Sequence, residues 1–279
     1  MRLANSLSPH LKTAPALRET CHEYNAAMEK PRRIEREFGV PFPGEILDES
    51  RRTQTALKRL PMADRLNWKE LFGREAPVVL DLGCGNGRYL IGSAWWRRDH
   101  DHLGVDILPV VIRYATRRAN QRGLTNIRFA VIGAQELLAR LVEPQSVSEI
   151  HLYHPQPYYD FAQVHRRLVT PEFLALVHRS LLSGGQFFLQ TDNPGYWRYL
   201  QQVVPIFFEL EERAAPWPDG PKGRTRREII ALRRGLQVFR AVGRVRSDLN
   251  EASARRLAES LPPPVFDADR RLRELDDLE

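Results

Sequence analysis

The sequence has few of the features that mark secreted, membrane or metal-binding proteins. It contains only two cysteines, Cys21 and Cys84, among 279 residues. A disulfide framework needs more, so we expect a reducing, cytoplasmic setting. The longest apolar runs are strand-length and fall short of the roughly 20 residues that cross a bilayer. The polar N-terminus lacks the apolar stretch of a secretory signal, so we expect no membrane partner.

Clusters of metal ligands are also scarce. The run D-H-D-H at residues 99–102 gathers such side chains, but it precedes a predicted strand, away from the predicted binding site. We expect His100 and His102 to belong to a solvated surface, and we expect the protein to hold no metal.

Basic residues are in excess. Lysine and arginine number 42 against 35 aspartates and glutamates, which gives a net charge of +7. A basic protein attracts polyanions through counterion release, so this balance favours RNA as a partner. With 42% hydrophobic and 28% charged residues, the chain has enough apolar side chains to bury a core.

Three regions are expected along the chain. Residues 1–45 lack an apolar period and contain several prolines, which predicts a mobile or loosely docked extension. Residues 46–249 form the predicted main domain, which opens with a helical stretch at 50–72 whose leucines share one face. Residues 250–279 form a charged tail, expected to be a surface helix or disordered. The oligomeric state is left open between monomer and homodimer.

From Val78 onward, short apolar strands alternate with helices. This alternation predicts an α/β, Rossmann-like fold, a doubly wound, mostly parallel sheet with helices on both faces. The strands are expected at 78–82, 103–107, 127–131, 149–153 and 186–190, with a final strand pair around Glu209 and around 238–242. The helices are expected at 89–96, 109–122, 134–141, 171–182 and 197–204. The glycines in the run 183–185 are expected to end the helix at 171–182.

A glycine-rich turn follows the first strand, with the sequence D-L-G-C-G-N-G at residues 81–87. Alternate glycines let the chain turn sharply and let a ligand lie against bare backbone. The helix that follows directs amide groups toward polar ligand atoms. Asp106 ends the next strand, 19 residues after Gly87, where a carboxylate can bind both hydroxyls of a ribose. The turn and the carboxylate suit NAD and S-adenosylmethionine equally.

The form D-x-G-x-G-x-G resembles the first motif of class I methyltransferases, whereas dehydrogenases have G-x-G-x-x-G. The resemblance implies S-adenosyl-L-methionine as the cofactor, held by the turn, by the end of the second strand and by the end of the third strand. The implied cofactor-binding residues are Asp81, Gly83, Gly85, Gly87, Asp106, Ile107, Gly133, Ala134 and Gln135. Gly133 stands where such enzymes usually have an acid beside the adenine, so we expect backbone contacts or Gln135 to bind that ring.

Across roughly residues 65–242 the chain resembles the bacterial tRNA (guanine-N7)-methyltransferase family. The run H-P-Q-P-Y at 154–158 occupies the place of the family's F-P-D-P-W, and R-R-L at 166–168 that of its K-R-R-L/I. The run T-D-N at 191–193 matches the family's T-D-N, and T-R-R-E at 225–228 resembles its T-x-[YF]-E. The resemblance implies methyl transfer to a guanosine of tRNA, with Gln156 and Asp192 as catalytic residues. The implied substrate-binding residues are His154, Tyr158, Asp160, Arg166, Arg167, Asp192, Thr225, Arg226 and Glu228.

Several positions depart from the family pattern, among them Tyr158, which replaces a tryptophan, and two that bear on the substrate. Gln156 replaces a catalytic aspartate, and Asp160 stands where the family has a substrate-binding lysine. Guanine N7 carries no proton, so its methylation needs alignment of the reacting atoms more than a general base. An aspartate accepts strong hydrogen bonds from two guanine N–H groups, whereas Gln156 offers one carbonyl acceptor and two amide donors. We therefore expect Gln156 to hold the base less tightly, and Tyr158 and Tyr159 to offer stacking faces.

Three alternative functions remain. In the first, the protein methylates a different RNA site or a small molecule, as Gln156 and Asp160 suggest. In the second, the protein binds RNA without catalysing methyl transfer. A nicotinamide-dependent oxidoreductase fits worst, because its fingerprint spacing is absent. If the protein methylates tRNA, we expect Arg166, Arg167 and Arg226 to contact RNA phosphates.

Overall fold

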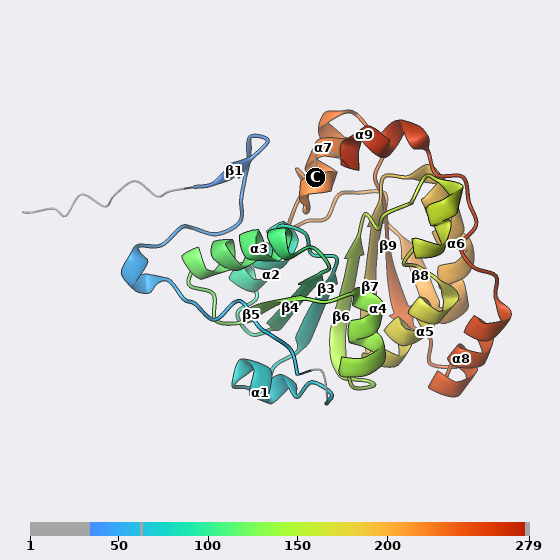
Figure 1. Ribbon diagram of the computed structural model, residues 1–279, viewed down its shortest axis with the longest axis horizontal. Coiled ribbons are helices and arrows are strands. Elements are labelled where there is room, and N and C mark those ends of the chain that lie inside the picture. The colour runs from blue at the N-terminus through green and yellow to red at the C-terminus, as the bar shows by residue number, and fades with distance from the viewer. Residues whose placement is uncertain (1–33, 62–63, 277–279) are drawn as a thin grey trace, which may run out of the picture. The chain divides into compact units, whose positions relative to one another are not determined.

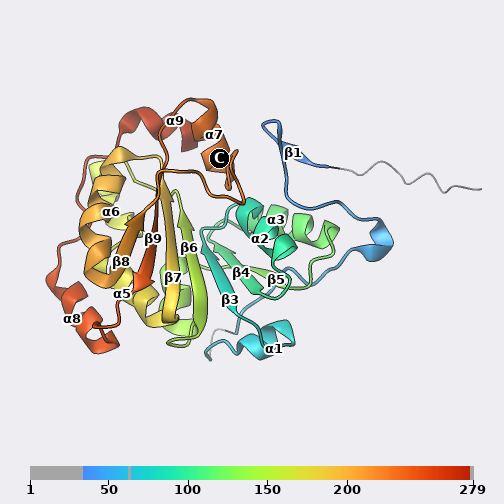
Figure 2. The same ribbon diagram turned by 180° about the vertical axis from the view of Figure 1, so that it is seen from behind.

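A seven-stranded sheet forms the centre of the computed structural model, which describes residues 34–61 and 64–276 (Figure 1). The strands lie in the order β5-β4-β3-β6-β7-β9-β8. Strands β5 to β7 in this order run parallel, and β9 runs antiparallel to both β7 and β8. The strand bounds are β3 Val78–Leu82, β4 Asp101–Asp106, β5 Ile127–Val131, β6 Val147–Tyr153, β7 Leu181–Thr191, β8 Phe208–Glu212 and β9 Phe239–Val245. The predicted doubly wound, mostly parallel sheet is confirmed, and Figure 2 shows β9 and β8 continuing it beyond β7.

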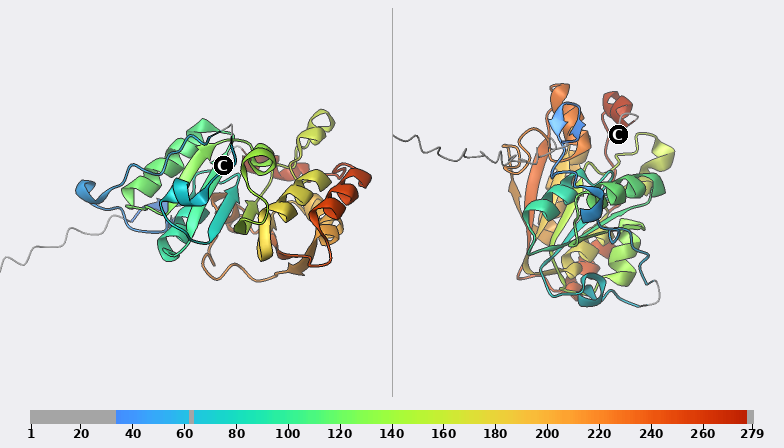
Figure 3. Two further views of the ribbon diagram at one scale, coloured as in Figure 1. Left: turned by 90° about the horizontal axis from the view of Figure 1, so that it is seen from below. Right: turned by 90° about the vertical axis from the view of Figure 1, so that its left-hand side faces the viewer.

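Helices cover both faces of this sheet (Figure 3). Successive residues of β3 alternate between two apolar clusters: Leu80 packs with residues of α5 and α6, and Val79 packs with residues of α2 and α3. This alternation follows from the two-residue period of a strand, and both faces of β3 are covered, so every one of its residues is buried. The helix bounds are α2 Arg88–Trp96, α3 Pro109–Gln121, α4 Ala134–Glu136 with a π-helical turn Leu137–Leu141, α5 Pro171–Ser180 and α6 Pro194–Phe207.

The stretch 50–72 was expected to be one helix, and this prediction is wrong. It contains a 3-10 turn, Glu49–Arg51, and a short helix α1, Trp68–Phe72. Between them the chain runs along the edge of β5, where Phe129 N donates to Ala56 O at 2.6 Å and Lys58 N donates to Phe129 O at 2.9 Å. An exposed sheet edge offers unpaired backbone groups, and here those pairings outweigh the helical spacing of the leucines.

The glycines at 183–185 were expected to end a helix, which is also wrong. Helix α5 already ends at Ser180, and Leu181 begins β7, which includes both glycines. Leu181 pairs with Val147 of β6. The parallel partner strand therefore decides where the helix stops.

The segment 34–45 is held firmly against α2 and α3, contrary to the expected loose docking. It forms a hairpin of β1 (Arg36–Glu37) and β2 (Val40–Pro41). Glu35 forms ion pairs with Arg118 and Arg122, and Phe42 is buried beneath arginine side chains. These partners lie about 80 residues away in the sequence, where no local pattern reveals them. The rest of the predicted extension, residues 1–33, lies outside the described residues.

Residues 250–276 also contact the sheet domain, through α8 (Glu251–Ser260), a 3-10 turn (Arg270–Leu272) and α9 (Arg273–Asp276). Ala254 and Ala258 of α8 belong to the core beside α5. Leu272 and Leu275 pack with Ile230 of α7 (Arg226–Arg233). The helices of the expected tail thus pack against the sheet domain. The predicted domain boundaries at 46 and 249 stay predictions. Of the helices in the described ranges, none combines the length and apolarity needed to cross a membrane.

Candidate functional site

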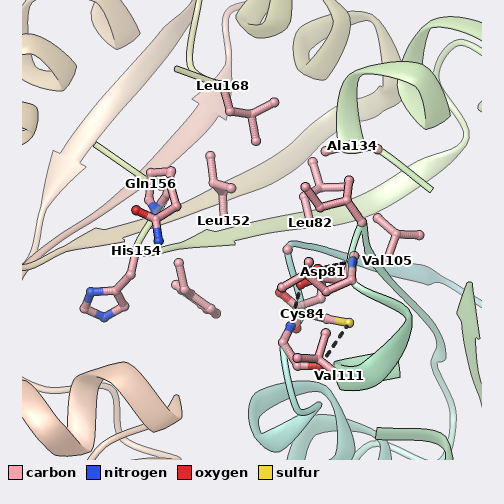
Figure 4. Close-up of a pocket in the computed structure, with 18 of the residues that line it drawn as sticks. Asp81, Leu82, Cys84, Val105, Val111, Ala134, Leu152, His154, Gln156 and Leu168 are labelled. Atoms are coloured by element: carbon pink, nitrogen blue, oxygen red, sulfur yellow. Dashed lines mark hydrogen bonds between the residues drawn. The ribbon is translucent and has the colours of Figure 1, made fainter. Parts of the chain in front are cut away.

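A cavity of about 470 Å³ lies at the carboxyl ends of β3, β4 and β6. Ligands in open α/β sheets bind at this edge, and the volume suits a small organic ligand. Figure 4 shows Asp81 and Cys84 on one side of the cavity and His154 and Gln156 on the other. Of the residues implied by sequence, the cavity is lined by Asp81, Gly83, Gly85, Asp106, Ile107, Gly133, Ala134, Gln135, His154, Gln156, Tyr158, Arg166, Thr225 and Arg226.

The glycine-rich turn presents bare backbone to this cavity. Gly83 and Gly85 have φ values of 77° and 50°, and a Cβ at either position would meet no protein atom within 4 Å. The open space is therefore available to a ligand. Gly87 is different, because a Cβ there would lie 2.8 Å from Ala115 Cβ. Its expected cofactor-binding role is corrected to close packing of α2 on α3.

Asp106 is oriented by the backbone before any ligand arrives. Its Oδ2 accepts a hydrogen bond from Gly85 N at 3.1 Å, and its Oδ1 accepts one from Leu108 N at 2.9 Å. A carboxylate has about four acceptor positions, so two remain for hydroxyl groups in the cavity. Asp106 thus lies beside the glycine turn, and its contact with a ribose stays a prediction.

Asp81 is the last residue but one of β3; it is 2% exposed and lies on the cavity wall. Burial, and secondly the negative charge of Asp106, raise the pKa of Asp81 to about 8, although Arg224 acts in the opposite direction. The carboxyl group is therefore largely protonated at neutral pH. A cationic ligand group placed beside it would favour the charged form.

The end of β5 supplies a carboxylate that sequence reasoning missed. Gly133, Ala134 and Gln135 line the cavity, and so does Glu136. Glu136 is exposed and forms an ion pair with Arg140 at 2.9 Å. Class I methyltransferases usually have an acid at the position of Gly133. Glu136 follows three residues later and supplies an acid close to that position. Its place in the first turn of a predicted helix was the available signal.

The loop after β6 has a constrained backbone. His154 and Tyr158 have φ values of 50° and 46°, a left-handed conformation that non-glycine residues adopt rarely. The backbone N of His154 donates to Gln190 O at 2.7 Å. Such conformations persist where the surroundings hold them, and they place Gln156 on the cavity side of the loop.

Side-chain contacts fix the tautomer of His154. The indole Nε1 of Trp217 can only donate, and it lies 2.6 Å from Gln190 Oε1. The amide nitrogen of Gln190 therefore faces Nε2 of His154, at 2.8 Å, and donates to it. The proton of His154 must then sit on Nδ1, which lies 3.4 Å from Oδ1 of Asp192.

Asp192 and Glu228 were expected to contact substrate, but they lie behind the cavity wall. Asp192 Oδ2 accepts a hydrogen bond from Arg227 Nε at 2.7 Å. Burial alone would raise the pKa of Asp192, but His154 and Arg227 outweigh it and hold that pKa well below its usual range. Glu228 is fully buried against Arg240. Neither carboxylate lines the cavity; each is paired with a buried arginine, which argues against the catalytic role implied for Asp192.

The two adjacent arginines 166 and 167 face opposite environments. Arg166 is exposed, lines the cavity and lies over the Tyr158 ring, 5.0 Å from its centroid. Arg167 is 3% exposed and donates to Pro157 O at 2.7 Å and to Pro264 O at 3.1 Å. The expectation that Arg167 meets RNA phosphates is therefore wrong. Asp160 lies outside the cavity lining, beside Arg273.

A buried polar cluster behind the cavity was also missed. Tyr153 lines the cavity, and its hydroxyl contacts His151 Nδ1 at 2.7 Å and Arg224 Nη1 at 2.5 Å. Burial lowers the pKa of His151 to about 4. Alternating polar residues in a predicted strand were the only local sign of this cluster.

His102, expected on a solvated surface, is fully buried and lies 2.9 Å from Ser93 Oγ. The expectation failed because strand β4 begins at Asp101 and carries His102 into the core. Within residues 34–61 and 64–276, no group of three or more potential ligands is arranged to hold a metal ion.

Comparison with known proteins places the chain in a family. The model of a putative methyltransferase family matches residues 75–241. A tRNA (guanine-N(7)-)-methyltransferase of Halorhodospira halophila is 32% identical over 182 residues, which cover 64% of this chain and 79% of the relative. The enzyme of the same name from Alkalilimnicola ehrlichii is 31% identical over 186 residues, covering 66% and 78%.

A solved structure of the 16S rRNA methyltransferase KamB is 16% identical and covers 64% of this chain and 92% of its own, with a TM-score of 0.48. The sequence relatives carry the assignment, and they confirm the resemblance seen in the motifs. The chain belongs to the tRNA (guanine-N(7)-)-methyltransferase family.

Proposed function

We propose that this protein transfers a methyl group from S-adenosylmethionine to N7 of a guanosine in tRNA, in the cytoplasm. One observation carries the proposal: a single cavity joins the open glycine turn and Asp106 to Gln156, Tyr158 and Arg226. Cofactor and base would then meet in one enclosed space. The names of the relatives supply the substrate and the position of the methyl group.

The residues on the cofactor side fit S-adenosylmethionine. Asp106 retains two acceptor positions for the ribose hydroxyls. The bare backbone at Gly83 and Gly85 leaves room for the amino-acid end, and the buried Asp81 suits its ammonium group. The residues at the end of β5, Glu136 among them, would face the adenine. The bound cofactor would supply a methyl group on a positively charged sulfur.

The residues on the substrate side fit a planar base. Tyr158 offers a stacking face, and Arg166, which lies over the Tyr158 ring, lines the same cavity. Arg226 also lines the cavity and lies 3.8 Å from Glu37. Gln156 is exposed toward the cavity, where its carbonyl can accept from a guanine N–H group. Because N7 needs no deprotonation, the protein's contribution is to align the base and to keep Gln156 in place. The relay from Trp217 through Gln190 to His154 does the latter.

The test is transfer of labelled methyl from S-adenosylmethionine to total tRNA, followed by nucleoside analysis. We expect 7-methylguanosine, and we expect Gln156→Ala to lower kcat at least roughly tenfold while cofactor affinity is kept. Gln201→Ala, an exposed glutamine on α6, is the matched control. Absence of any methylated nucleoside, with cofactor binding measured separately, would reject the proposal. Methylation of another nucleoside or of a small molecule would show that guanosine N7 of tRNA is not the methyl acceptor.

A further inference from the structure

The C-terminal segment 269–276 docks beside the cavity. Leu272 and Leu275 are 6% and 1% exposed and pack against Ile230 of α7. Asp276, one turn beyond Arg273, lines the cavity itself. A segment more than 100 residues from the loop after β6 therefore forms part of the same site (Figure 1).

The acidic residues of this segment are engaged by arginines. Asp276 lies 2.6 Å from Arg227 Nη1, and Glu274 forms an ion pair with Arg234. Both arginines belong to α7 or follow it directly, so these pairs fix the segment to α7. Asp269, the third acid of the segment, pairs with Arg271, and Arg273 pairs outside the segment, with Asp160.

Arg273 is the cation of this segment that contacts Asp160, close in sequence to Gln156. Its Nη2 lies 3.2 Å from Oδ2 of Asp160, and its side chain is 62% exposed. An exposed pair of this kind adds little stability, but it does orient the guanidinium. The contacts with Asp160 use two of its nitrogens, Nη1 and Nη2, and a guanidinium has five N–H donors. The donors that do not contact Asp160 remain available to a second acceptor.

Asp160 itself stands between two cavity-lining residues, Tyr158 and Arg166. The methyltransferase family has a lysine at the position of Asp160, so this chain has a negative charge where a positive one is expected. Arg273 brings a cation to that place from 113 residues away. The Asp160–Arg273 pair is neutral, so Arg273 offsets the negative charge of Asp160 and still has N–H donors to offer a polyanionic substrate.

We propose that Arg273 binds a backbone phosphate of the RNA next to the target nucleotide, so that the C-terminal segment completes the substrate site. The inference rests on the proposed function for the identity of the RNA. A guanidinium matches a phosphate through two parallel hydrogen bonds, and Asp160 holds it in position for them.

The test compares Arg273→Gln with Arg255→Gln in the full-length protein. Arg255 is 81% exposed on α8, which Figure 1 shows at the opposite end of the sheet from α9. Affinity for unmethylated tRNA is measured at several salt concentrations. Arg273→Gln should weaken binding by about fivefold to tenfold and reduce the slope of log affinity against log salt by about one. Arg255→Gln should change neither, and both should keep the thermal midpoint and cofactor affinity of the wild type.

A second variant separates phosphate binding from neutralisation of Asp160. Asp160→Asn in the Arg273→Gln background removes both charges and keeps the net charge of the wild type, so tRNA affinity should stay about fivefold below wild type if Arg273 binds a phosphate. Equal affinity and slope in Arg273→Gln and wild type would overturn the inference. Recovery of wild-type affinity in the double variant would show that Arg273 only neutralises Asp160, and a lowered thermal midpoint would assign Arg273 a structural role. Failure of the wild type to methylate tRNA would contradict the proposed function. The role of Arg273 is tested separately, by the tRNA affinity of the variants.

Discussion

The side-chain amide nitrogen of Gln190 lies 2.8 Å from Nε2 of His154, and this contact joins the end of β7 to the loop after β6. Gln190 is fully buried, and its carbonyl oxygen accepts from Trp217. One glutamine therefore sets the tautomer of His154 and the position of the loop that carries Gln156.

Gln190→Ala should leave the Trp217 N–H and the His154 ring nitrogen buried without a partner. We expect the free energy of unfolding to fall by about 3 kcal/mol, because each orphaned group costs about 1–3 kcal/mol. We also expect kcat to fall more than KM changes, because the loop loses its alignment. Denaturant unfolding and steady-state kinetics measure these effects. Adding His154→Phe should recover part of the stability, and no recovery would contradict the relay.

Asp106→Ala should weaken S-adenosylmethionine binding whichever acceptor is methylated. The change removes the acceptor for two hydroxyls and the partner of Gly85 N. Loss of charge-assisted hydrogen bonds predicts an affinity lower by roughly 30-fold or more. Calorimetric titration measures it, with Asp248→Ala on the exposed surface as the control. Unchanged affinity would show that the ribose lies elsewhere.

Asp81→Asn should stabilise the ligand-free protein increasingly as pH rises. The pKa of Asp81 is about 8 in the folded state, above the ordinary aspartate value of 3.8. Between these values the folded state binds the extra proton, so the contribution of Asp81 to stability falls as pH rises toward 8. The advantage of the variant over wild type should grow by on the order of 2 kcal/mol between pH 5 and pH 7.

Thermal unfolding at both pH values checks this trend, with exposed Asp48→Asn as the control. The same Asp81→Asn variant should bind S-adenosylmethionine more weakly, because an amide cannot pair with an ammonium group. An advantage that stays constant with pH would contradict the raised pKa.

Arg166→Gln and Arg167→Leu should separate RNA binding from stability. Arg166→Gln removes an exposed cation at the cavity and should weaken tRNA binding about fivefold without changing the thermal midpoint. Arg167→Leu strands buried carbonyl groups at Pro157 and Pro264 and should lower the free energy of unfolding by about 2–4 kcal/mol. Comparable midpoints for the two variants would contradict the burial of Arg167.

Local patterns account for the elements that were predicted correctly. The strands 78–82 and 127–131 match to the residue, because short, mostly apolar runs bounded by polar turns specify buried strands. The segment at 50–72 has leucines at helical spacing, yet residues near Ala56 pair with the edge of β5. That outcome depended on a partner about 70 residues away, which local spacing does not encode.

The sequence by itself determined the fold class, the glycine turn, the placement of Asp106 and the family. Each of these depends on neighbours within a few residues or on motifs in fixed order. Only the tertiary structure decided which charged side chains face the cavity. Asp192 finds Arg227, 35 residues on, and Arg167 finds a carbonyl 97 residues on. A charge is buried only where the fold brings such partners to it. Because these partners are distant in the sequence, local patterns do not show which charged side chains are buried.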